Sequence, residues 1–147
     1  MRREFRAGTG TQSSHERQVN YLLDENVPPY LTRAIAALHA RDYPDDSVLS
    51  PRDVGSQGQE DETWIASLIA SGEPWTVVGR DLMRKEWSLL QSSELTWFVL
   101  NKGWASVEFW DLSSKLVKAW PNIVAAGLRS PGMVFNVALS GKVQLSR

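Results

Sequence analysis

The chain has 147 residues, of which 42% are hydrophobic and 22% charged; these values exclude a disordered chain and fit one globular domain. It contains no cysteine, which excludes disulfide bonds and thiolate metal sites, and no long apolar run or signal peptide, so we expect a cytoplasmic protein without membrane contacts. The net charge of −1 excludes nucleic-acid binding by a broadly basic surface and leaves only a local basic patch for such a partner.

Residues 1–18 have the composition of a disordered leader. The segment contains Gly, Ser, Thr and Gln, and its four arginines and two glutamates give it a net charge of +2. A basic arm that contacts a partner is the alternative interpretation. We expect the folded domain to occupy residues 19–147.

Apolar strands alternate with helices from residue 19 onward. Strands are expected over residues 19–23, 45–49, 75–78 and 95–100. Helices are expected over residues 28–40, 61–72 and 82–90. This alternation predicts an α/β domain with a mainly parallel sheet.

The C-terminal third predicts a long amphipathic helix and a closing pair of strands. Residues 107–120 are amphipathic, and we expect Pro121 to break or kink the helix before a short helical piece that ends at residue 128. The closing strands are expected over residues 133–139 and 142–145, on either side of Ser140 and Gly141.

Three acidic residues stand out because of their places in this pattern. Asp24 and Asp81 each follow a predicted strand, and ligands of parallel sheets bind outside the carboxyl ends of the strands. Asp61 opens a predicted helix, and it reaches the same edge only if the loop before it returns there.

Carboxylates that are brought together repel one another unless a cation or a proton relieves the repulsion. Mg²⁺ and Mn²⁺ prefer oxygen ligands and keep several waters, so two or three carboxylates suffice to hold them. Such a metal can activate water for phosphodiester hydrolysis. The alternative is structural: Asp24 would cap the helix at Pro28 or end its strand, and Asp81 would cap the helix that follows it. Asp61 with Glu62 would occupy a first helical turn.

The segment LLDENVPPYL, followed by DETWIASLIASGEPWTVVGRDL, resembles the PIN-like domains, and specifically their compact D-E-N-x-P branch of VapC-type toxins. The resemblance runs over residues 21–100, with a continuation to residue 145. It implies a three-layer α/β/α fold and a metal-dependent endoribonuclease that uses Mg²⁺ or Mn²⁺. It also implies the toxin half of a type II toxin–antitoxin pair, with a cognate antitoxin as partner.

The same resemblance assigns roles to the acidic residues. Asp24, Asp61 and Asp81 would bind the metal and orient the attacking water. Glu25, Asn26 and Glu62 are candidates for support of this site.

Two departures from the family pattern are visible in the sequence. The stretch over residues 27–39 contains no acid, and Gly79 occupies a position that is commonly Thr or Ser. A hydroxyl that could order a metal-bound water is therefore missing.

Basic residues surround the last acid of the set. Arg80, Arg84 and Lys85 flank Asp81 and could grip RNA, with Trp87 stacking on an unpaired base. A solvated helix face is the alternative. Exposed tryptophans or the apolar face of residues 107–120 could contact the antitoxin or a second copy in a homodimer, and burial of these residues in the core is the alternative.

Two other functions remain open at this level. The first is a PIN-like binding module with weak or no catalysis. The second is a phospho-acceptor receiver domain, which also opens with a strand that ends in acids. Asp81 could serve as the acceptor, but no convincing Thr and Lys follow it.

Overall fold

The computed structural model describes residues 18–55, 58–80, 90 and 93–146 of the chain. The predicted leader up to residue 17 and nearly all of the predicted helix over residues 82–90 lie outside the described residues. Asp81, Arg84, Lys85 and Trp87 lie outside them as well.

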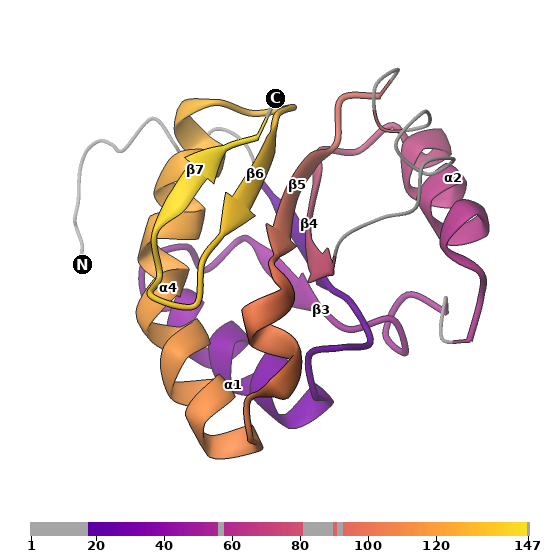
Figure 1. The fold of residues 1–147 in the computed structure, drawn as a ribbon. Helices are drawn as coiled ribbons and strands as arrows, with labels where there is room; N and C mark the ends of the chain where they lie inside the picture. Colours follow the sequence, from indigo (N-terminus) through magenta and orange to yellow (C-terminus); the bar gives the residue numbers. More distant parts are fainter. Residues whose placement is uncertain (1–17, 56–57, 81–89, 91–92, 147) are drawn as a thin grey trace.

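The centre of the protein is a mainly parallel sheet (Figure 1). Its described strands are β2 (Asn20–Leu23), β3 (Ser47–Leu49), β4 (Trp75–Arg80), β5 (Thr96–Leu100), β6 (Val134–Val137) and β7 (Val143–Leu145). They are arranged in the order β3-β2-β4-β5-β6-β7, and only β7, at the end of that order, pairs antiparallel among them. The predicted strands are confirmed, although the one expected over residues 45–49 begins at Ser47.

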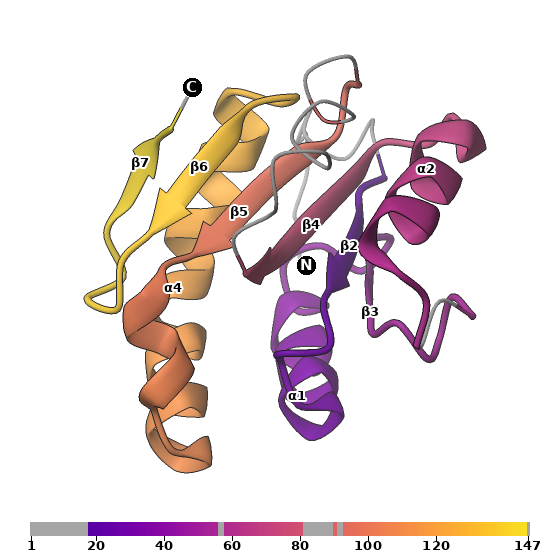
Figure 2. The same cartoon turned by 45° about the vertical axis from the view of Figure 1, so that its right-hand side comes forward.

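Helices cover both faces of this sheet. Helices α1 (Pro29–His39) and α4 (Phe109–Arg129) pack on one face, and α2 (Asp61–Ser71) packs on the other (Figure 2). A short 3-10 helix, η2 (Lys102–Ser106), joins β5 to α4. The predicted three-layer α/β/α architecture is confirmed.

Side-chain alternation along the strands divides the core between the two faces. Leu22 and Val77 belong to the apolar cluster under α2, whereas Leu23 and Val78 belong to the cluster under α1 and α4. Because successive side chains of a strand point to opposite faces, the residue after Leu23 lies on the α2 side. Asp24 is that residue.

The long helix α4 continues through Pro121, so a break at this proline is wrong, and a kink within the continuous helix stays a prediction. Trp120 and Ile123, on either side of the proline, are buried, whereas Pro121 itself is exposed. A proline inside a helix costs about 3 kcal/mol. Burial of the flanking apolar side chains against the sheet offsets this cost and keeps both halves in one helix.

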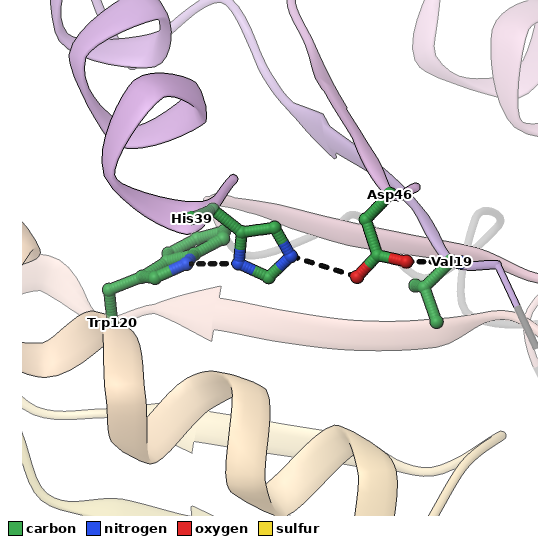
Figure 3. Close-up of polar contacts among 4 residues, drawn as sticks. All are labelled: Val19, His39, Asp46 and Trp120. Carbon is green, nitrogen blue, oxygen red and sulfur yellow. Dashed lines mark hydrogen bonds and ion pairs between the residues drawn. The ribbon is translucent and has the colours of Figure 1, made fainter. Parts of the chain in front are cut away.

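A polar network joins the elements at the amino edge of the sheet (Figure 3). The Asp46 carboxylate accepts hydrogen bonds from the Val19 N–H at 2.9 Å and from His39 Nε2 at 2.8 Å. The Trp120 indole N–H donates to His39 Nδ1 at 3.1 Å. Because an indole N–H only donates, Nδ1 is the acceptor and the hydrogen of the neutral imidazole is on Nε2. We call Val19, His39, Asp46 and Trp120 the amino-edge network.

Most tryptophans of the described chain pack in the core, as expected. Trp64, Trp75, Trp97, Trp104 and Trp120 are buried. By contrast, Trp110 at the start of α4 is 81% exposed. Among the described residues, no helix has both the length and the apolar character needed to cross a membrane.

Candidate metal and nucleic-acid site

The chain adds strands to one side of β2 and then to the other side, so the strand order switches between β2 and β4. From β2 the chain passes through α1 to β3 on one side, and then through α2 to β4 on the other side of β2. The two connecting helices cover opposite faces, so a crevice opens between the carboxyl ends of β2 and β4. Asp24 follows β2 at this point, and Asp81 follows β4.

The Asp24 side chain lies across the end of β4. Its Oδ2 accepts a hydrogen bond from the Arg80 backbone N–H at 3.1 Å, and its Oδ1 accepts one from the Asn26 N–H at 2.8 Å. Only 8% of the residue is exposed. Helix α1 has Pro28 as its N-cap and no side-chain cap, so the alternative that Asp24 caps this helix is wrong.

Burial raises the pKa of the Asp24 carboxyl above its ordinary value. Hydrogen bonds from the N–H groups of Arg80 and Asn26, and the charge of Arg80, act in the opposite direction without cancelling the effect of burial. An ionised carboxylate at this place is therefore costly by itself. A cation near its oxygens would remove that cost.

A small cavity of about 130 Å³ opens beside this carboxylate. Its walls come from both strands and from the α2 side, and include Asp24, Glu25, Asn26, Gln59, Trp64 and Arg80. At about 30 Å³ per water, such a volume holds roughly four water molecules. The carboxylate and amide oxygens of Asp24, Glu25, Asn26 and Gln59 are ligands that Mg²⁺ and Mn²⁺ prefer, and the Arg80 cation lines the same cavity.

Glu25 forms a hydrogen bond with the segment before α2 at the same edge of the sheet. Its Oε2 accepts a hydrogen bond from the Gly58 N–H at 2.8 Å, and Gln59 lines the cavity. Helix α2 begins at Asp61, so the loop before it does return to the carboxyl edge and carries the Asp61 backbone there. The structure describes the backbone of Asp61 and Glu62 but not their side chains.

A comparison with protein families matches the PIN-like domains over residues 19–102, which is more than half of the chain. The chain belongs to the PIN-like domain family. The matched residues include β2, β4 and β5 with their carboxyl ends, and therefore the crevice described above. No curated protein and no solved structure matches the chain.

The PIN-like domain brings together part of the predicted site. Asp24, Glu25, Asn26 and Arg80 line one cavity. Within the described part of the chain, no three acidic or histidine side chains converge on a point that could hold a metal ion. The roles expected of the Asp61 and Asp81 side chains stay predictions.

Asn101 is a residue of this edge that the sequence reasoning overlooked. It follows β5, whose Leu100 pairs in register with Arg80 of β4. Its Oδ1 accepts the Gly103 N–H at 3.0 Å and thereby caps η2. The signal that singled out Asp24, a polar residue directly after an apolar strand, would also have found Asn101.

Proposed function

We propose that this PIN-like domain is an endoribonuclease that hydrolyses phosphodiester bonds with Mg²⁺ or Mn²⁺ held by Asp24, Asp61 and Asp81. One observation carries the proposal: a buried carboxylate with a raised pKa lies beside a cavity at the crevice between β2 and β4. Membership of the PIN-like family, whose fold is that of a nuclease, supports the same activity.

Each residue of the proposed site would have its own role in hydrolysis. A bound cation would activate a water and stabilise charge on the phosphoryl group. The backbone N–H groups of Arg80 and Asn26 hold the two Asp24 oxygens in place, and each oxygen keeps a lone pair for a further interaction. We propose that the Arg80 side chain, with Arg84 and Lys85, binds the RNA backbone.

We further propose that the enzyme is the toxin of a toxin–antitoxin pair and acts in the cytoplasm, where its RNA substrate is found. Its partner would be a cognate antitoxin, and a homodimer is the alternative assembly. The start of α4 supports an apolar contact of this kind, because Trp110 is 81% exposed and packs edge to face on Phe109, with ring centroids 5.3 Å apart.

The test is RNA cleavage with Mg²⁺ or Mn²⁺ by the wild type, Asp24→Asn and Asp81→Asn. We expect each variant to lose at least about 100-fold in rate, a size typical for the loss of one electrostatic stabiliser. Asp42→Asn is the matched control, because this acid lies on the exposed side of the chain just after α1. It should cleave at the wild-type rate, and equal rates for all four proteins would contradict the acidic-site mechanism.

Metal binding gives a second readout that does not depend on cleavage. Mn²⁺ should raise the melting temperature of the wild type and leave that of Asp24→Asn unchanged, because a ligand that binds only the folded state stabilises it. Stabilisation by Mn²⁺ and RNA binding without cleavage would instead identify a PIN-like binding module.

A further inference from the structure

Gly79 lies beside Asp24 on the neighbouring strand. Leu23 pairs in register with Val78, so the next residues along the two parallel strands, Asp24 and Gly79, are also neighbours. Val77 packs in the α2-side cluster, and by alternation position 79 faces the same side. Any side chain at position 79 would therefore project toward the Asp24 carboxylate.

No space exists for such a side chain. A Cβ atom at position 79 would lie 2.6 Å from Asp24 Cγ and 3.1 Å from Asp24 Cβ, and it would overlap Oδ2 as well. These three atoms are its nearest neighbours, and all belong to Asp24. Carbon atoms in contact are normally about 3.5–4.0 Å apart. A single methyl group at position 79 is thus incompatible with the observed position of the carboxylate.

Space, and not backbone conformation, accounts for glycine at this position. Gly79 is not among the glycines with positive φ, such as Gly72 at the end of α2, so its backbone suits any residue. Glycine in a strand interior weakens the strand and often marks a site where another group approaches closely. Here the approaching group is the Asp24 carboxylate.

We propose that Gly79 is a positioning residue, whose missing side chain lets the Asp24 carboxylate lie on the end of β4 at the cavity. This inference rests on the proposed function, in which Asp24 is a metal ligand. With a side chain at position 79, the carboxylate rotates away from β4 and loses its hydrogen bond from the Arg80 N–H. A serine at this position, although it supplies a hydroxyl, displaces the carboxylate in the same way.

The test is a cycle of four proteins: wild type, Gly79→Ala, Asp24→Ala and the double variant. We expect Gly79→Ala to lower the melting temperature by roughly 6 °C in the wild-type background and by roughly 2 °C or less with Asp24→Ala. The Asp24→Ala substitution removes Cγ and Oδ2, the two nearest atoms, and leaves only the 3.1 Å approach to Cβ. Gly127→Ala is the control, because a Cβ there lies 3.5 Å from Phe98, an ordinary contact. It should cost nothing in either background.

Comparison of Gly79→Ala in the wild type and in Asp24→Ala tests the proposal even if one of these variants does not fold. A folded double variant beside an unfolded Gly79→Ala protein supports the proposal. Equal losses in both backgrounds overturn it, because the cost would then belong to the strand backbone or to the retained Cβ and not to the Asp24 carboxylate.

Mn²⁺ affinity, measured with the metal alone, connects this position to the site. We expect Gly79→Ala and Gly79→Ser each to weaken Mn²⁺ binding at least tenfold and Gly127→Ala to leave it unchanged. Wild-type affinity in both Gly79 variants would overturn the positioning role. A wild type that binds no Mn²⁺ and cleaves no RNA, yet shows the stability coupling, would contradict the proposed function and leave the contact between Gly79 and Asp24 established.

Discussion

Two aspartates at opposite edges of the sheet have hydrogen-bonded carboxylates in different surroundings. Asp24 is buried as a whole residue, and Asp46 is half-buried with a carboxylate that is largely covered. Each carboxylate accepts two hydrogen bonds in the described structure. Both donors to Asp24 are backbone N–H groups beside a cavity, whereas one donor to Asp46 is the imidazole of His39.

The difference lies in what each carboxylate holds together. Asp46 joins the start of β2 to the end of α1, and His39 extends the connection to Trp120 of α4. The Asp24 carboxylate accepts from the turn after β2 and from the end of β4, next to strands that the sheet already pairs. A buried acid that links separate elements serves stability, whereas a buried acid with a raised pKa at a crevice is a candidate for chemistry.

The largest expected effect on stability follows from Asp46→Asn. An amide at this position can accept only one of the two N–H groups, so either Val19 or His39 loses its acceptor. His39 cannot switch its ring hydrogen to adapt, because Nδ1 is needed to accept from Trp120. We expect a loss of about 2 kcal/mol in the free energy of unfolding, measured by urea denaturation.

Asp24→Asn is the matched control for this variant. It also loses one acceptor, but it removes a desolvated charge, so we expect a loss below about 1 kcal/mol. The order should reverse in RNA cleavage, where Asp46→Asn keeps the activity of the wild type. Equal losses of stability in the two variants would contradict the division between the two edges.

A smaller effect is expected from Trp120→Phe, which replaces the indole with a smaller aromatic ring and removes the donor to His39 Nδ1. The expected loss is about 1 kcal/mol in the free energy of unfolding. Trp110→Phe, in the same helix at an 81% exposed position, should cost close to nothing in the same denaturation experiment. If both substitutions cost the same, the hydrogen bond in the amino-edge network contributes nothing measurable.

The smallest effect concerns the pH dependence of stability in EDTA. Because burial raises the pKa of Asp24 above its ordinary value of 3.8, the unfolded chain releases this proton first as pH rises. The folded state then binds more protons, and stability falls with increasing pH. We expect the wild type to lose stability relative to Asp24→Asn as pH rises above 3.8, measured by thermal unfolding. A constant difference between the two proteins up to pH 7 would show that Asp24 carries no such penalty.

Much of the fold could be predicted because its signals are local. Apolar runs mark β2, β4 and β5, Pro29 opens α1, and Gly72 ends α2 in the left-handed conformation with φ 74°. The same signals predicted that Asp24 lies at the carboxyl edge of the sheet, because it directly follows a strand. The continuity of α4 through Pro121 could not be predicted, because the flanking burial that outweighs the proline depends on packing against the sheet.

The sequence by itself determined the alternation of strands and helices, the family resemblance and the order of the acids, since these depend on residues that are neighbours in the chain. Only the tertiary structure decided which groups meet. Trp120 and His39 bond across 81 positions, and Gly79 makes room for Asp24 because the register of β2 and β4 brings the two residues together. Contacts of this kind join residues that are far apart in the chain, and they form only when the strands pair and the helices pack on the sheet.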